Sequence, residues 1–296
     1  MTATCNSDII TVAVDINTAT VLFGKRKEIY KMIIDAHVHA FADGIAERAI
    51  SKLETVSGVK AATNGTTKEM RELLKKCGID YGVLLPVATK PTQQTTINNW
   101  AKEEYRDGII SFGSVHPYAD DVEEEIERIK ALGLKGVKVH NDYQGVFIFD
   151  EKCDRMYKKC EELGLPIVFH MGYDPISTLV HRAMPYDLIE LTEKYPKLKI
   201  IGAHMGGVYA WESVYKYIAG NPNIWLDTSF VAGYIDEQLF ADIIKKHGTD
   251  RVMFASDLPW SNPADEIALV DRLPLTDSEK DRIFSGNVME LLELAL

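Results

Sequence analysis

Six of the eight histidines stand at or just after the carboxyl ends of short apolar segments. These six are His37, His39, His116, His140, His170 and His204. A carboxylate, Asp257, follows another segment of the same kind. Several imidazoles and one carboxylate, with a position left for water, form a donor set that suits Zn²⁺ or a similar divalent ion. Because such an ion activates water, the donor set indicates a metal site that performs hydrolysis.

The first two of these histidines form an HxH pair at positions 37 and 39. If the segment is a β-strand, its side chains alternate between two faces, so Asp35, His37 and His39 share one face. Val38 takes the other face. Two imidazoles on one face converge, as a transition-metal site requires. An HxH pair alone is a weak signal, since most such pairs are structural or lie on the surface.

The predicted site therefore depends on a combination of positions rather than on one motif. His170 and His204 end two later apolar segments, and Asp257 ends the last one. A strand-end aspartate by itself is often only a helix N-cap. His116 precedes a proline, and we expect it to be a buried, hydrogen-bonded histidine or a group behind the ligands rather than a ligand.

Segments of strand and helix pattern alternate around these residues. Eight short runs are apolar and bounded by Gly, Pro or Asp, as in parallel strands covered on both faces. The predicted strands are 33–38, 81–87, 109–115, 134–140, 166–171, 199–204, 224–229 and 251–256. Helical periodicity is clearest in residues 121–132, 151–163 and 236–247. Capping-box spacing occurs at Thr66 with Glu69, Thr276 with Glu279, and Asn287 with Glu290.

Eight β/α units over roughly 260 residues predict an α/β fold, a (β/α)8 TIM barrel, with its active site at the C-terminal ends of the strands. A doubly wound open sheet is the main alternative. Against it, the first strand–helix junction contains neither GxGxxG nor a phosphate-binding loop. Cys153 and Cys160 lie on the apolar face of a predicted helix, so we expect core residues and not metal ligands.

Residues 1–31 differ from the predicted barrel domain of residues 32–296. Short β-type runs at 9–14 and 20–23, joined by a turn, predict a small N-terminal β-hairpin extension packed on the barrel. The alternative is that the functional protein begins near Met32.

The composition narrows the class of protein. The 296 residues include 33 Lys+Arg and 44 Asp+Glu, a net charge of −11, without a long basic cluster, which argues against nucleic acid as a partner. No apolar run reaches the roughly 18 residues of a membrane span, and the start lacks the layout of a secretory signal. The four cysteines form no CxxC pair, so we expect reduced thiols in a cytoplasmic protein.

Four motifs in order resemble one known group of enzymes. They are IIDAHVHAF at 33–41, PIVFHMG at 166–172, IIGAHMGG at 200–207 and MFASDLPW at 253–260. Together they resemble the metal-dependent amidohydrolase superfamily, and most closely its amidohydrolase-2 branch, which includes aminocarboxymuconate-semialdehyde decarboxylase. The similarity runs from about residue 32 to the end and does not cover residues 1–31.

The resemblance implies a role for each matching residue. His37, His39 and His170 would bind the metal, and Asp257 would be a further ligand or a partner of the bound water that moves its proton. His204 would bind a second metal or, where there is one metal, orient the water. One Zn²⁺ per chain is the default expectation, two are the alternative, and a homodimer is expected from the family.

The sequence differs from the family pattern at Ala42, and it does not decide the roles of Lys138 and His140. In this branch a proline often follows the aromatic residue of the first motif, but here Ala42 follows Phe41. Lys138 and His140 share a face of the fourth predicted strand, where some superfamily members carry a carbamylated lysine that bridges two metals. The alternative is a protonated Lys138 that pairs with a carboxylate or with the substrate.

Four further residues are candidates for substrate contact. Tyr143, Tyr173 and Trp260 follow predicted strands and either line a substrate pocket or only cover the barrel mouth. Arg182 either binds a substrate carboxylate or is a solvated surface arginine.

The motifs lead to one first hypothesis and two alternatives. The first is a metal-dependent hydrolase that uses an activated water on a small amide, lactone or ester. The second is a metal-dependent, non-oxidative decarboxylase of a small unsaturated or aromatic carboxylic acid. The third is a barrel whose histidines hold only a structural metal.

Overall fold

The computed structural model describes residues 30–175 and 180–296. Apart from Tyr30 and Lys31, the predicted hairpin at residues 1–31 lies outside the described residues. Tyr30 is buried, its hydroxyl donates to Asp271 at 2.9 Å, and its ring lies 4.6 Å from that of Phe284. The start of the described chain is therefore packed on the C-terminal part of the domain.

All eight predicted strands are confirmed, and neighbouring strands pair in parallel. The strands are β1 (Ile34–Val38), β2 (Tyr81–Leu84), β3 (Ile109–Ser111), β4 (Gly113–Ser114), β5 (Val137–Val139), β6 (Ile167–Phe169), β7 (Ile200–Gly202), β8 (Ile224–Asp227) and β9 (Val252–Met253). The third predicted strand forms both β3 and β4, which are separated by Phe112.

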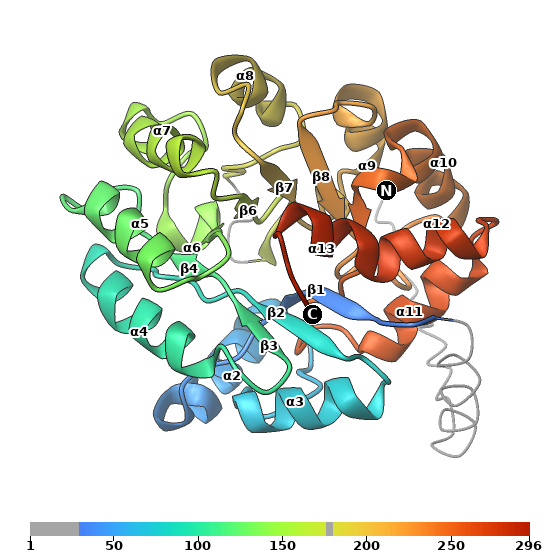
Figure 1. Ribbon diagram of the computed structural model, residues 1–296, viewed down its shortest axis with the longest axis horizontal. Coiled ribbons are helices and arrows are strands. Elements are labelled where there is room, and N and C mark those ends of the chain that lie inside the picture. Colours follow the sequence, from blue (N-terminus) through green and yellow to red (C-terminus); the bar gives the residue numbers. More distant parts are fainter. Residues whose placement is uncertain (1–29, 176–179) are drawn as a thin grey trace, which may run out of the picture.

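The strands form a ring surrounded by helices (Figure 1). The pairing order is β1-β2-β3 and β4-β5-β6-β7-β8-β9. Between β9 and β1, the backbone N of Ala36 donates to Phe254 at 2.9 Å, and the backbone N of Asp257 donates to His37 at 2.8 Å. These bonds join the last strand to the first, so the prediction of a TIM barrel is confirmed.

The helices follow the strands and carry the predicted patterns. They are α2 (Asp43–Ser57), α3 (Thr67–Lys76), α4 (Gln94–Glu104), α5 (Val122–Ala131), α6 (Asn141–Gln144), α7 (Asp154–Leu163), α8 (Asp187–Lys194), α9 (Trp211–Ser213), α10 (Glu237–His247), α11 (Pro263–Arg272), α12 (Asp277–Asp281) and α13 (Asn287–Leu291). Single turns of 3-10 or π helix are η1 (Pro91–Gln93), η2 (Glu151–Cys153), η4 (Val214–Ile218), η5 (Thr249–Arg251) and η6 (Arg282–Gly286). Among the described residues, none of these helices has both the length and the hydropathy that a membrane span needs.

Two of the three predicted capping boxes hold at least in part. Thr66 accepts a hydrogen bond from the backbone N of Glu69, and Thr276 and Glu279 cap each other reciprocally. The third, at Asn287, is wrong. Its side chain instead donates to the carbonyl oxygens of Thr249 and Val252, because α13 continues directly from η6 and needs no cap there.

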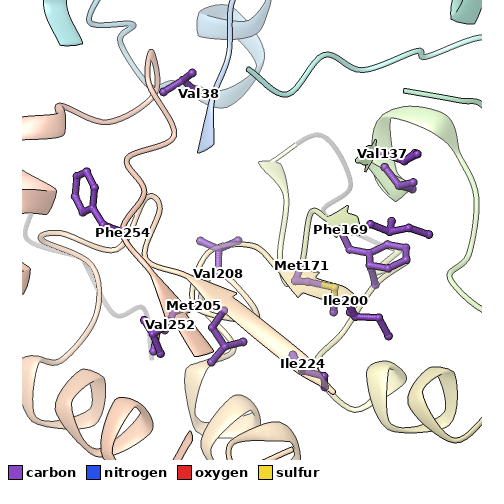
Figure 2. Packing of buried hydrophobic residues seen from close by; sticks show 14 of the residues in the cluster. Val38, Val137, Phe169, Met171, Ile200, Met205, Val208, Ile224, Val252 and Phe254 are labelled. Atoms are coloured by element: carbon purple, nitrogen blue, oxygen red, sulfur yellow. The ribbon is translucent and has the colours of Figure 1, made fainter. Parts of the chain in front are cut away.

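The core has two layers, separated by the ring of strands. The inner layer fills the barrel and is closed at one end by apolar residues of α13. The outer layer packs strands against helices, and Figure 2 shows Phe169, Ile200 and Ile224 in this layer. Cys153 and Cys160 are fully buried in the outer layer, which confirms them as core residues.

Candidate active site

The HxH pair brings two ring nitrogens together at the end of β1. Nε2 of His37 and Nε2 of His39 lie 3.0 Å apart. Nδ1 of His37 is 2.9 Å from Oδ2 of Asp227, and Nδ1 of His39 is 2.7 Å from the carbonyl oxygen of Leu85. A carboxylate and a carbonyl only accept, so each Nδ1 carries a proton and, in a neutral ring, each Nε2 keeps its lone pair. Oδ1 of Asp257 lies 3.4 Å and 3.2 Å from these two Nε2 atoms.

The spacing of these three atoms fits a bound divalent ion. Zn²⁺ binds nitrogen and oxygen ligands at about 2.0–2.2 Å, so tetrahedral ligands stand roughly 3.3–3.5 Å apart. The three lone-pair atoms of His37, His39 and Asp257 are 3.0–3.4 Å apart. Lone pairs at this distance repel one another unless a cation stands among them. The residues present therefore suit a metal ion. In the metal-free protein, a proton shared among these three atoms relieves the repulsion.

A bulge in β1 turns His37 into the barrel. Asp35 pairs with Gly82 of β2, but Val38 pairs with Leu84, so three steps along β1 oppose two along β2. The extra residue changes the alternation of side chains, as a β-bulge does. The prediction that Asp35 shares a face with His37 is therefore wrong.

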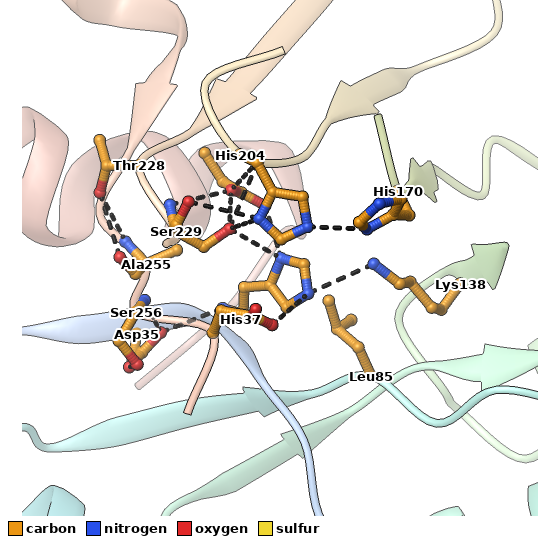
Figure 3. A network of polar contacts seen from close by, with 12 residues as sticks. Asp35, His37, Leu85, Lys138, His170, His204, Thr228, Ser229, Ala255 and Ser256 are labelled. Carbon is orange, nitrogen blue, oxygen red and sulfur yellow. Dashed lines mark hydrogen bonds and ion pairs between the residues drawn. The ribbon is translucent and has the colours of Figure 1, made fainter. Parts of the chain in front are cut away.

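Asp35 instead connects β1 to the segment after β9 through hydrogen bonds with Ser256. Its carboxylate accepts hydrogen bonds from the backbone N of Ser256 at 2.9 Å, from Oγ of Ser256 at 2.5 Å and from the backbone N of His37 at 3.1 Å. Burial raises the pKa of Asp35 to about 7, although these hydrogen bonds act in the opposite direction. Figure 3 shows Asp35 and Ser256 beyond His37 on the side away from Lys138.

Two residues of the site adopt left-handed backbone conformations. Asp257 has φ 68° and His204 has φ 59°, which costs a residue with a Cβ atom about 1–2 kcal/mol. Hydrogen bonds hold both: the backbone N of Asp257 donates to His37, and the backbone N of His204 donates to Oδ1 of Asp227 at 2.9 Å. In these conformations both side chains lie close to the HxH pair: the rings of His37 and His204 are 5.2 Å apart, and Oδ1 of Asp257 is 3.4 Å from Nε2 of His37.

His170 reaches the cluster through His204. Nδ1 of His170 lies 2.9 Å from Nε2 of His204, and its ring stacks on that of His140 at 4.1 Å. Ligand atoms within 4.8 Å of one another form two groups: His37, His204 and Asp257, and His140, His170 and Asp174. Nε2 of His170 is buried without a hydrogen-bond partner among the described residues. That His170 shares one ion with the HxH pair stays a prediction.

Lys138 is a fully buried cation beside the histidines. It lies on β5 between two outward-facing valines, and its Nζ is 3.3 Å from Nε2 of His37 (Figure 3). Burial lowers the pKa of Lys138 to about 8, while Asp227 and Asp257 oppose that shift. His140 directly follows β5 at the N-cap of α6, and its Nδ1 accepts a hydrogen bond from the backbone N of Tyr143 at 3.4 Å.

Asp227 is a site residue that the sequence analysis missed. It ends β8, so the criterion that selected Asp257, a carboxylate at the end of a strand, was available to find it. Its carboxylate contacts His37, the backbone of His204 and Ser229. Burial favours the neutral form of Asp227, but His37 and the hydrogen bonds outweigh it and lower the pKa of Asp227 below its usual range.

The residues expected to contact substrate lie in different surroundings. Tyr143 stacks on His140 at 3.7 Å, whereas Tyr173 is exposed and its ring meets that of His181. Nη1 of Arg182 lies 3.2 Å from Oδ1 of Asp142, so the guanidinium is paired with this chain's own carboxylate.

An aromatic pair beside His204 escaped the sequence analysis. Phe230 stacks on Tyr234 at 4.9 Å, and the Phe230 ring lies 6.4 Å from the His204 ring. Trp260 hydrogen-bonds through its backbone N to Asp257 at 2.8 Å.

A TIM barrel with imidazoles and a carboxylate at the C-terminal ends of its strands defines the class of metal-dependent barrel enzymes. The chain belongs to the amidohydrolase family, whose sequence model matches residues 34–294. This membership confirms the family predicted from the four motifs.

One relative and several proteins of similar fold are decarboxylases. The chain is 30% identical over 123 residues to a gamma-resorcylate decarboxylase of Polaromonas sp. strain JS666, a match covering 35% of this chain and only 37% of that protein. The fold is similar to 5-carboxyvanillate decarboxylase from Sphingomonas paucimobilis, with a TM-score of 0.64 and 18% identity over 89% of this chain and 99% of that one. A 5-carboxyvanillate decarboxylase from Novosphingobium aromaticivorans, solved with bound manganese, gives a TM-score of 0.68 and 20% identity over 90% and 97%.

Proposed function

We propose that this protein is a divalent-metal-dependent decarboxylase of a hydroxylated aromatic carboxylic acid. The metal site is supported by one observation: the facing lone-pair atoms of His37, His39 and Asp257, 3.0–3.4 Å apart. Decarboxylation is supported over hydrolysis by the relative and the two structures named above, which are all decarboxylases. The alternative weighed in the sequence analysis thus becomes the preferred function.

His37, His39 and Asp257 would hold the ion, with Nε2 of His170 as a further donor. The ion would supply positive charge that draws electron density from a substrate carboxylate or phenolate oxygen. The donor set suits Zn²⁺, and a structure of similar fold contains manganese, so both are candidates here.

The chain's own residues would bind the substrate and move a proton. The Lys138 ammonium, 3.3 Å from His37, offers a charge that attracts a carboxylate. The stacked pair of Phe230 and Tyr234 offers a flat apolar surface for an aromatic ring. Decarboxylation breaks a bond from a ring carbon to CO₂ and forms a C–H bond, so a proton must reach that carbon. We assign this transfer to Asp257, whose carboxylate contacts both HxH imidazoles. It would first take up a proton from the substrate hydroxyl or from water and then pass it to the ring carbon.

Hydrolysis of a small amide, lactone or ester is the second candidate function. It is favoured by the contact of Asp257 with both His37 and His39, because the same carboxylate would deprotonate a water held at the site and protonate a leaving group. His204 would then steady the negative charge that develops on the substrate oxygen.

The two candidates differ in what they release. Full-length protein loaded with Mn²⁺ or Zn²⁺ is incubated in ¹⁸O-labelled water with 2,6-dihydroxybenzoate, 5-carboxyvanillate and a panel of esters, lactones and amides. Release of CO₂, with no ¹⁸O in the aromatic product, is the expected result. Incorporation of ¹⁸O into a cleaved ester, lactone or amide without CO₂ release would establish hydrolysis instead. Inactivity of metal-loaded protein on the whole panel would count against both.

A further inference from the structure

The carboxylate of Asp227 contacts two histidine-bearing segments at once. Its Oδ2 lies 2.9 Å from Nδ1 of His37, and its Oδ1 accepts from the backbone N of His204 at 2.9 Å. We propose that Asp227 is a positioning residue that sets the tautomer of His37 directly and that of His170 through Ser229 and His204. Both rings thereby keep an unprotonated Nε2. This inference rests on the proposed metal site but not on the proposed reaction.

The direct connection involves His37. An ionised carboxylate has no proton to donate, so Nδ1 of His37 must donate to Oδ2 of Asp227. In the neutral ring, which is the form that binds metals, Nε2 then carries only its lone pair. This Nε2 is the atom that lies 3.0 Å from Nε2 of His39 and 3.3 Å from the Lys138 ammonium.

The indirect connection begins at the Ser229 hydroxyl. Oγ of Ser229 lies 2.5 Å from Oδ1 of Asp227, and its single proton must point to that carboxylate. The same Oγ lies 2.9 Å from Nδ1 of His204, and it has only lone pairs left for this contact. The Ser229 carbonyl oxygen, 3.3 Å from the same Nδ1, is also an acceptor. Nδ1 of His204 therefore carries a proton.

The indirect connection ends at His170. With Nδ1 of His204 protonated, Nε2 of the neutral ring is an acceptor, and it lies 2.9 Å from Nδ1 of His170. The proton in this contact must come from His170. Its Nε2 is then unprotonated. This nitrogen is buried, makes no hydrogen bond within residues 30–175 and 180–296, and lies 3.5 Å from Oδ2 of Asp174. A buried lone pair of this kind is suited to a cation.

The Asp227→Asn substitution reverses the direct connection while keeping the shape of the side chain. Backbone N atoms of His204 and Ser229 hold Oδ1 of residue 227 at 2.9 Å and 3.1 Å, so an asparagine must keep its oxygen there and turn its NH₂ toward His37. Nδ1 of His37 then has to accept, and the proton moves to Nε2. Long-range ¹H–¹⁵N spectra of the metal-free full chain distinguish the two tautomers. We expect Nδ1–H for His37 in the native protein and Nε2–H in the variant.

The affinity for Mn²⁺, measured by titration calorimetry, is expected to fall about 10- to 100-fold in Asp227→Asn. Ser229→Ala tests the other connection. It should leave the His37 tautomer unchanged and weaken the preference for a proton on Nδ1 of His204 and of His170, because the shorter 2.9 Å contact with Oγ is lost and the backbone carbonyl at 3.3 Å remains. Asp236→Asn, at the N-cap of α10, is the matched control and should change neither tautomers nor affinity.

Three results would overturn the proposal: Nε2–H on His37 or His170 in the native protein, Nδ1–H on His37 in Asp227→Asn, or native Mn²⁺ affinity in that variant. If Asp227→Asn does not fold, the native spectrum and Ser229→Ala still decide. If the native protein shows the expected tautomers and binds no divalent ion, the role of Asp227 stands and the proposed function fails.

Discussion

Asp35 on β1 and Ser256, the residue before Asp257, are joined by two hydrogen bonds of 2.9 Å and 2.5 Å. They connect the strand that carries the HxH pair to the segment that carries the site carboxylate. We expect Ser256→Ala to destabilise the fold by about 1–3 kcal/mol, because Asp35 keeps a buried oxygen without its partner. Urea unfolding measures this change.

The same substitution should weaken metal binding, since the distance between Asp257 and the HxH pair depends on this link. Ser285→Ala, whose hydroxyl makes one 3.4 Å bond to a backbone carbonyl, is the control for loss of a serine hydroxyl. Equal stabilities of the two variants would show that the link contributes nothing specific.

Metal removal should lower thermal stability. An ion that binds only the folded chain stabilises it by about 2.7 kcal/mol at 100 times Kd, which corresponds to a Tm change of roughly 5–10 °C for a domain of this size. We expect this change between Mn²⁺-loaded and chelator-treated protein in differential scanning calorimetry. His39→Ala should abolish it and His181→Ala should not. A Tm independent of metal in the native protein would contradict the predicted site.

Asp257→Asn separates a catalytic from a structural role. As the proposed proton-transfer group, Asp257 should be needed for turnover, and its loss should lower kcat about 10²- to 10⁴-fold. The variant should remain folded and should still bind metal through His37 and His39. Circular dichroism, metal content and the CO₂ assay are measured together. A variant that loses its metal or its fold in parallel with its activity would support the structural role instead.

Stability should depend on pH through His247, which is not one of the residues of the proposed metal site. Its ring is buried on α10 between Ile224 and Gly220, and burial lowers its pKa to about 4 from 6.5. Between pH 6.5 and pH 4 the His247 imidazole is therefore protonated in the unfolded chain but neutral in the folded chain. The free energy of unfolding consequently falls as the pH falls from 6.5 to 4. Between pH 7 and pH 5 the native protein should lose about 2 kcal/mol more than His247→Gln. Parallel pH profiles of the two proteins in urea unfolding would contradict this.

Deletion of residues 1–29 should leave a folded, metal-binding barrel. The deletion keeps Tyr30, which packs against Phe284 and donates to Asp271. The expected result is soluble protein with native metal content and a Tm within a few degrees of the full chain. Aggregation or loss of metal would show that the extension is part of the domain.

The sequence alone determined the barrel and most of the residues at its mouth. Eight apolar strand segments that alternate with helices are compatible with few folds other than a TIM barrel. In that fold the carboxyl ends of the parallel strands lie together at one end of the barrel. His37, His39, Lys138, His204 and Asp257 could therefore be predicted to converge from their positions at strand ends.

Only the tertiary structure decided how these residues face one another. The period-two rule misplaced Asp35, because the bulge in β1 exists only in its pairing with β2. The strand-end signal of Asp227 was present in the sequence, but its bond to His37 depends on two strands far apart along the chain. The direction of a hydrogen bond is set by the partner on its other side, and that partner is known only when the chain has folded.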